Sequence, residues 1–147
     1  MNRAREPRVT VAEFAALTRE KLPIVGQFDI RVESIEAERV VARLPSGDNV
    51  HRPGGTVTGP ALLALADVAM YALVLARIGP VELAVTTSLN ANFLRRPSLG
   101  ADIVAEARML KLGKRLAVGE VTLNSDGDAE PVAHVTLTYS IPPPDGA

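Results

Sequence analysis

Asp67 lies in the middle of a long apolar segment, where it is the only charged residue between Gly59 and Ala76. A helix that is apolar on every face must be covered on every face by protein or by lipid. An isolated carboxylate in such surroundings is costly, and carboxylates in unusual environments gather where chemistry happens. Asp67 is therefore a candidate catalytic group. The alternative is a core acid that only caps or hydrogen-bonds a neighbouring element.

The segment before this helix, residues 51–60, is rich in glycine and ends in Gly59-Pro60. Proline suits the first helical position, and Gly59 or Thr58 suits the cap. Free N–H groups at the positive end of a helix can bind an anion or an oxyanion. Because Pro60 has no N–H, the Gly59 N–H is the leading candidate donor. The alternative is an ordinary tight loop that leads into a helix.

Gly59 and Asp67 are too far apart along one helix to act on the same group. Eight residues span about 12 Å at a rise of about 1.5 Å per residue. A general base and an oxyanion donor must each lie within about 3 Å of one reacting group. If both are catalytic, the site must form between two subunits, and the spacing predicts a dimer.

The residues before this loop predict a short helix and two strands. Thr10-Val11-Ala12-Glu13 has the spacing of a capping box and predicts a helix that ends before Pro23. Alternation from Phe28 to Ile35 predicts a strand. Its antiparallel partner is predicted over Arg39–Leu44, after a turn near residues 37–38.

Gly79-Pro80 ends the long helix, and four more strand segments are predicted after it, over 85–93, 102–109, 117–123 and 133–141. In the first of these, alternation groups Thr86 with Ser88, Asn90 and Asn92 on one face. Half-buried alternation with short connections indicates an antiparallel sheet. We therefore predict an α+β fold in which a curved sheet of five to six strands wraps around one long central helix. We also predict that residues 1–147 form a single domain, with an arm and short helix over 1–23 and a flexible tail over 142–147.

Composition excludes several classes of function. The chain has 147 residues, 47% of them apolar, enough to bury one sizeable core. A net charge of −1 argues against nucleic-acid binding. Without cysteine there are no thiolate metal sites, and two scattered histidines do not build a zinc site, so we predict neither metal nor cofactor. Residues 1–10 contain no apolar run and are not a secretory signal, and residues 61–76 are short for a membrane span. We expect a cytoplasmic protein with no membrane partner.

Three stretches in order resemble the hotdog-fold acyl-CoA thioesterases, in particular the phenylacetate-pathway (PaaI-type) group. The resemblance extends from about Phe28 to Ile141. The stretches are the Gly-rich loop and helix that end in Leu65-Ala66-Asp67, the strand 86–97 that ends in Phe93-Leu94-Arg95-Arg96-Pro97, and the basic hairpin 111–115.

The resemblance implies hydrolysis of an acyl-CoA thioester at a dimer interface. Asp67 matches the family's catalytic carboxylate, acting as nucleophile or as base on water. Gly59 matches the backbone oxyanion donor from the other subunit, and Thr86 matches a hydroxyl that helps to hold the water. The chain departs from the family in having Thr58-Gly59-Pro60 in place of His-Gly-Gly, and Arg52 in place of an Asn or Gln that contacts the thioester. These departures bear on substrate and efficiency more than on fold.

Further residues are candidates for binding the substrate. His51 and Arg52 could replace the missing amide contact or line the mouth of the site, with Gly55 and Thr58 in the same loop. Basic side chains near loops could bind the CoA phosphates, the alternative being solvated strand ends: Arg95, Arg96, Lys114 and Arg115. Tyr71, one turn after Asp67, could donate to it or simply pack in the core. His134 falls on the polar face of its strand.

Three hypotheses follow. The first is an acyl-CoA thioesterase that acts as a dimer or a dimer of dimers. The second is a hydratase-like lyase of the same fold, for which His51 is the available histidine. The third is an acyl-CoA-binding module without catalysis. Release of free thiol from acyl-CoA separates the first from the other two.

Overall fold

The computed structural model describes residues 5–144, and these residues form one sheet and three α-helices. The helices are α1 (Val11–Lys21), α2 (Pro23–Gln27) and α3 (Gly59–Ile78), with a 3-10 turn at Asp48–Val50. The strands are β1 (Arg31–Ile35), β2 (Arg39–Leu44), β3 (Val85–Phe93), β4 (Ile103–Leu112), β5 (Leu116–Ser125) and β6 (Pro131–Ser140). The predicted α+β class is confirmed.

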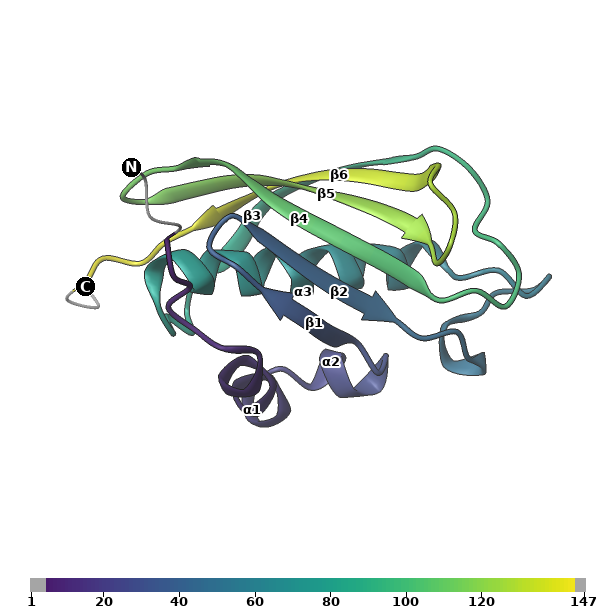
Figure 1. Ribbon diagram of the computed structural model, residues 1–147, viewed down its shortest axis with the longest axis horizontal. Coiled ribbons are helices and arrows are strands. Elements are labelled where there is room, and N and C mark those ends of the chain that lie inside the picture. Colours follow the sequence, from purple (N-terminus) through teal and green to yellow (C-terminus); the bar gives the residue numbers. More distant parts are fainter. Residues whose placement is uncertain (1–4, 145–147) are drawn as a thin grey trace.

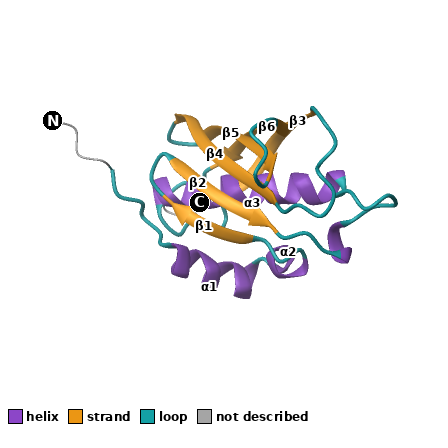
Figure 2. Cartoon of the chain, turned by 45° about the vertical axis from the view of Figure 1, so that its right-hand side comes forward, coloured by secondary structure: helices purple, strands orange, loops and turns teal. Residues whose placement is uncertain are grey.

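The sheet is antiparallel throughout, with the strand order β1-β2-β4-β5-β6-β3. Its concave face packs on α3, which contacts all six described strands, while α1 and α2 lie beside β1 (Figure 1). Figure 2 shows the strands passing across α3 in a single layer. The arrangement is a hotdog fold, in which the sheet wraps around the central helix α3.

α3 is a core helix because its apolar residues meet protein on nearly all sides. Within residues 5–144 it is the one helix with the length and hydropathy of a membrane span, and 67% of its apolar window is buried inside the fold. Thr58 caps it by accepting from the Ala61 N–H, Pro60 lies in its first turn, and Gly79 ends it with a φ of 96°. These boundaries match the sequence prediction.

The N-terminal region is confirmed in part. Thr10 and Glu13 form the predicted reciprocal capping box, and α1 ends before Pro23. The five-residue helix α2 was not predicted, because one turn after a proline shows no apolar period. The strand expected from Phe28 begins only at Arg31, because residues 28–30 form the turn out of α2. Of the predicted tail, residues 145–147 lie outside the described residues.

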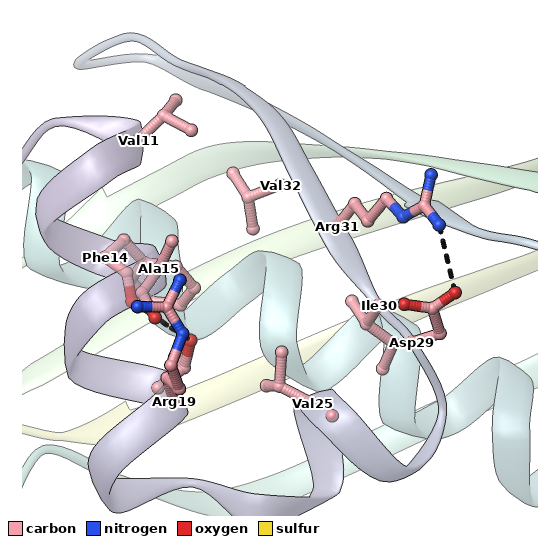
Figure 3. Close-up of a pocket in the computed structure, with 11 residues that line it drawn as sticks. Val11, Phe14, Ala15, Arg19, Val25, Asp29, Ile30, Arg31 and Val32 are labelled. Atoms are coloured by element: carbon pink, nitrogen blue, oxygen red, sulfur yellow. Dashed lines mark hydrogen bonds and ion pairs between the residues drawn. The ribbon is translucent and has the colours of Figure 1, made fainter.

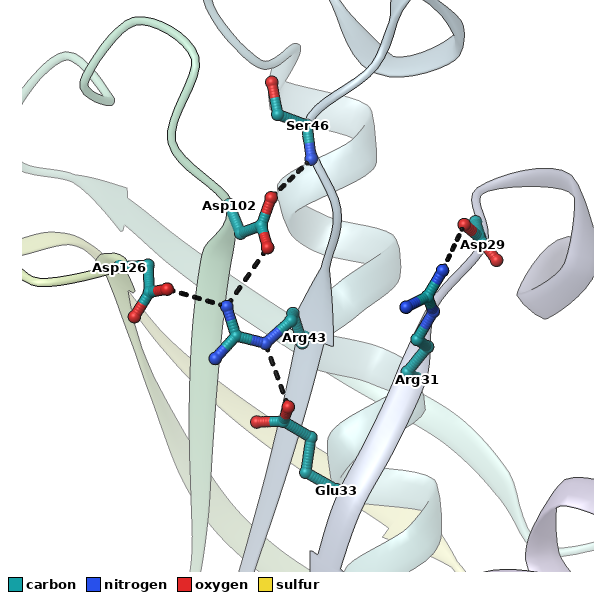
Figure 4. Close-up of polar contacts among 7 residues, drawn as sticks. All are labelled: Asp29, Arg31, Glu33, Arg43, Ser46, Asp102 and Asp126. Carbon is teal, nitrogen blue, oxygen red and sulfur yellow. Dashed lines mark hydrogen bonds and ion pairs between the residues drawn. The ribbon is translucent and has the colours of Figure 1, made fainter.

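At one end of the sheet an ion cluster links β1 and β2 to Asp102, which precedes β4, and to Asp126, which follows β5 (Figure 4). Arg43 on β2 donates to Glu33 Oε2 at 2.9 Å, to Asp102 Oδ2 at 3.1 Å and to Asp126 Oδ2 at 2.8 Å. The Ser46 N–H donates to the other Asp102 oxygen at 2.9 Å. These contacts, the Ser46 N–H first and Arg43 next, hold the pKa of Asp102 below its ordinary value, and the three acids raise the pKa of Arg43.

We expect Arg43→Gln to reduce the free energy of unfolding by about 1 kcal/mol at pH 7, because it leaves three acids facing one another. A carboxyl whose pKa is lowered by folding stabilises the protein above its unfolded-state pKa of about 3.9, and this contribution is lost as the pH falls through the folded pKa. The deficit should therefore shrink at about pH 2.5, which urea titrations at both pH values would measure. Arg31→Gln is the control, because its pair with Asp29 is 63% and 59% exposed. An equal deficit in both variants, or one that does not depend on pH, would contradict this account of the cluster.

Candidate active site

Two hydroxyl groups hold the Asp67 carboxylate. α3 places Asp67 half-buried beneath the junction of β3 and β6. The Thr86 Oγ1 on β3 and the Tyr139 phenol on β6 each donate to Asp67 Oδ1 at 2.6 Å. Among residues 5–144, Asp67 Oδ2 accepts no hydrogen bond. One oxygen is thus fixed in place, and the other is available to a substrate or a water molecule.

A β-bulge turns Thr86 toward the helix. Thr86 pairs with Tyr139, but Ser88 pairs with Thr138, so Thr87 is an extra residue in β3. Thr86 therefore shares the helix-facing side with Leu89, and the prediction that it shares a face with Ser88 is wrong. The reason is that one inserted residue reverses the alternation of every side chain beyond it. Without the bulge the Thr86 hydroxyl would face away from Asp67.

Sequence reasoning missed Tyr139, which is separated from Asp67 by 72 residues. It is 3% exposed, and its phenol oxygen also lies 3.1 Å from the Asp67 backbone carbonyl, which shares the same proton. Burial first, and then the Asp67 charge and hydrogen bond, raise the pKa of Tyr139 well above its ordinary value. The phenol therefore stays protonated and remains a donor at every working pH. A buried tyrosine that must satisfy its hydroxyl is a signal that could have suggested it.

Tyr71 is a packing residue beside the site. Its hydroxyl donates to the Glu82 carbonyl at 2.9 Å, and not to Asp67. Its ring stacks on Tyr139 at 6.2 Å and meets the edge of Phe14 at 5.8 Å. Of the two alternatives left open by the sequence, core packing is therefore the one observed.

A cavity of about 200 Å³ opens at Asp67. It is lined by Asp67, Tyr71 and Thr86 together with Leu17, Lys21 and Leu22 of the α1 region. The carboxylate thus lies at a small pocket with mainly apolar walls.

A second cavity, of about 440 Å³, lies at the start of α3 and includes Gly59. Pro60 has no N–H, and the Ala61 and Leu62 N–H groups donate to Thr58. Within residues 5–144 the Gly59 N–H donates to no acceptor, so it is the free N–H at the start of α3. Three guanidinium side chains also line this cavity, those of Arg52, Arg95 and Arg96. The space combines a free backbone donor, a helix N-terminus and positive charge, which together suit an anionic ligand.

The two cavities lie at opposite ends of β3. A Cβ on Gly59 would lie 3.7 Å from Phe93 Cζ, at the last residue of the strand, whereas Asp67 bonds Thr86, its second residue. Within one chain the structure therefore keeps the two predicted catalytic groups apart, as their spacing in the sequence requires.

The remaining predicted site residues are spread more widely. His51 contacts the Ser46 hydroxyl at 3.0 Å, and its backbone forms an isolated β-bridge with Val57. Neither His51 nor Gly55 lines the two cavities above. The Thr58 hydroxyl is used as the helix cap. Lys114 and Arg115 lie in the β4–β5 hairpin, at the end of the sheet where β3 begins and away from Arg95 and Arg96. His134 pairs with Glu120 at 3.0 Å on the polar face of the sheet.

A third cavity, of about 330 Å³, lies between α1, α2 and β1 (Figure 3). It uses other residues of α1, including Phe14 and Arg19, and its one acid, Asp29, pairs with Arg31 at 3.0 Å. A carboxylate held by a cation in this way resembles an ordinary surface pair, unlike the arrangement at Asp67.

We expect Tyr139→Phe to reduce the free energy of unfolding by about 1.5–3 kcal/mol, because the phenol donates to a charged group. Tyr71→Phe is the matched control. Its hydroxyl donates to a neutral carbonyl, so the loss should be about 0.5–1.5 kcal/mol. Urea unfolding of both variants would measure the difference. A loss in Tyr71→Phe as large as that in Tyr139→Phe would contradict a charge-assisted bond to Asp67.

Comparison with known proteins identifies the family. A family model described as the thioesterase superfamily matches residues 54–132, more than half of the chain, and this span includes Gly59, Asp67 and Thr86. The Pseudomonas aeruginosa protein PA1618, named as an esterase, is 30% identical over 125 residues, covering 84% of this chain and 85% of that protein.

Solved structures agree with this match. A Silicibacter sp. TM1040 protein described as a thioesterase is 42% identical, with a TM-score of 0.86, and the match covers 96% of this chain and 97% of that one. The phenylacetic acid degradation protein PaaI of Thermus thermophilus is 28% identical, with a TM-score of 0.71, covering 81% of this chain and 98% of that one. The chain has the hotdog fold, belongs to the thioesterase superfamily and is a thioester-hydrolysing enzyme.

Proposed function

We propose that the protein hydrolyses acyl-CoA thioesters to a free acid and CoA. The observation that most supports this proposal is the Asp67 carboxylate, which is held by Thr86 and Tyr139 and lines a small, mainly apolar cavity. A thioester presents an electrophilic carbonyl carbon and a thiolate leaving group, so it needs a positioned base or nucleophile and a donor for the developing oxyanion.

Asp67 serves as the base in this proposal. Its Oδ1 accepts two hydrogen bonds, so Oδ2 is the oxygen that takes a proton from water. The hydroxide formed attacks the carbonyl carbon, the C–S bond breaks, and the departing thiolate takes up the proton. Direct attack by Oδ2 through an acyl-enzyme anhydride is the alternative chemistry for the same oxygen.

In this proposal the Gly59 N–H of a second subunit donates a hydrogen bond to the oxyanion. β3 lies at one edge of the sheet, and among the described strands it pairs with β6 alone. Unpaired strand edges favour pairing with another chain. Antiparallel pairing of β3 with its own copy sets the first residues of one strand beside the last residues of the other. Thr86 and Asp67 of one subunit then lie beside Phe93 and Gly59 of the other.

Such a dimer also gathers the positive charge. The cavity with Arg52, Arg95 and Arg96 on one subunit comes to the same end of the joined sheet as Lys114 and Arg115 of the other. These side chains bind the CoA phosphates through charge-assisted bonds. Arg95 pairs with Glu130 in the free protein, so it must exchange that acid for a phosphate.

The reaction consumes only water and the thioester, so the proposal includes neither a metal nor a cofactor. The cytoplasmic location expected from the sequence stays a prediction. Assembly beyond a dimer is likewise a prediction, and β3 pairing accounts for the dimer alone.

We expect Asp67→Asn to lower kcat by about 100-fold or more, because general-base catalysis contributes about 10²–10⁴-fold. The amide keeps the shape of the carboxylate but does not accept the proton. The measurement is thiol release from a panel of acetyl-, hexanoyl-, phenylacetyl- and decanoyl-CoA. Asp29→Asn is the control, since this acid lies beside the third cavity, and it should keep the wild-type rate.

Three results would count against the proposal. Unchanged turnover in a folded Asp67→Asn variant would exclude the role of Asp67. Hydration of crotonyl-CoA without thiol release would favour the lyase. Saturable binding without turnover would favour a binding module.

A further inference from the structure

α1 and the residue that follows it contribute three residues to the lining of the cavity at Asp67: Leu17, Lys21 and Leu22. The apolar part of the lining consists of Leu17, Leu22, Tyr71, Ala84 and Val85. At about 200 Å³ the space is smaller than the roughly 300–1,000 Å³ of pockets for drug-sized ligands. A group that enters it must therefore be small and largely apolar.

Two opposite charges border the same cavity. Lys21 is the last residue of α1, and Glu82 lies in the segment between α3 and β3. Both side chains are exposed, and within residues 5–144 neither forms an ion pair. A longer alkyl chain that reached these two hydrated groups would have to desolvate them, which is unfavourable.

The position of α1 is fixed by contacts close to the site. The Thr10–Glu13 capping box begins the helix, and Phe14, 1% exposed, packs edge-on against Tyr71 at 5.8 Å. Leu17 follows Phe14 by three residues and lies on the same side of the helix. These contacts therefore hold α1 against Tyr71, which stacks on Tyr139, and Tyr139 in turn bonds Asp67.

The two cavities differ in charge, and each suits a different part of an acyl-CoA. The space at Gly59 is lined by three arginines, and the space at Asp67 is lined mainly by apolar side chains. The phosphates of CoA suit the first, and the acyl group suits the second.

On this basis, and resting on the proposed acyl-CoA hydrolysis, we propose that α1 sets the substrate range. Leu17 and Leu22 end the acyl pocket, and Lys21 with Glu82 borders its exit. The enzyme then prefers short acyl chains or a single aromatic ring over long chains.

Substitution of Leu17 directly tests whether α1 limits the length of the acyl pocket. Leu17→Ala opens the end of the pocket, and kcat/KM for decanoyl-CoA relative to hexanoyl-CoA should rise about 10-fold, since one methylene in an apolar pocket changes discrimination by about 10–200-fold. Leu17→Trp fills the pocket and should lower phenylacetyl-CoA turnover relative to acetyl-CoA. Leu110→Ala is the matched control, because this leucine is 56% exposed on β4 and should leave the ratios unchanged.

Lys21→Ala tests the exit and is an exposed substitution that the fold tolerates. It should raise decanoyl-CoA turnover several-fold with little effect on hexanoyl-CoA. If Leu17→Ala does not fold, Lys21→Ala and Leu17→Trp carry the test.

The two proposals fail in different ways. If the wild-type enzyme releases thiol but prefers long chains, or if no Leu17 or Lys21 variant shifts the ratios, the role of α1 is wrong and the hydrolysis stands. If the wild-type enzyme releases no thiol from any acyl-CoA, the proposed function fails and the role of α1 fails with it.

Discussion

The site depends on one half-buried carboxylate that is held by two hydroxyls from different strands. Asp67 is carried by the helix at the centre of the core, while Thr86 and Tyr139 come from neighbouring strands of the sheet. A charge on an apolar helix is tolerated only where polar partners reach it. Here both partners donate to a single oxygen, Oδ1, and among the described residues the other oxygen accepts no hydrogen bond. The same contacts join the helix to the sheet, so fold and site share their key interaction.

The second constraint is the geometry of the central helix. A straight helix separates Gly59 from Asp67 by about 12 Å, and the structure keeps them at opposite ends of β3. In the proposed dimer, two-fold pairing makes β3 antiparallel to its own copy, so the end of one strand would meet the start of the other. The arrangement that completes the sheet edge is thus the arrangement that would complete the site. In each subunit, the mainly apolar cavity is lined by Asp67, and the cavity with three arginines is lined by Gly59, whose N–H is the proposed donor.

Much of this could be predicted from local sequence signals. Thr58, Pro60 and Gly79 mark the ends of α3 through capping and backbone preference, and the β2 boundaries follow from alternation between residues 39 and 44. The choice of Asp67 as a candidate catalytic residue rests on its charge in an apolar segment. These features are local, because each depends on residues within one element.

Long-range features could not be predicted in the same way. The partnership of Tyr139 with Asp67 joins residues 72 positions apart and depends on sheet order. The face of Thr86 was mispredicted because nothing in the alternation of residues 85–93 indicates a bulge at Thr87. The contact of α1 with the Asp67 cavity depends on how the N-terminal helix packs on Tyr71, which α1's own pattern does not reveal.

The most direct measurement of the central claim is activity in mixed dimers of two inactive variants. Asp67→Asn lacks the base, and Gly59→Pro removes the N–H at a helical position that accepts proline. If the site joins Asp67 of one subunit to Gly59 of the other, random reassociation makes half of the dimers mixed, each with one intact site, and restores roughly one quarter of wild-type activity. If the mixture stays as inactive as its parents although mixed dimers form, the site does not cross the subunit boundary and the account is wrong.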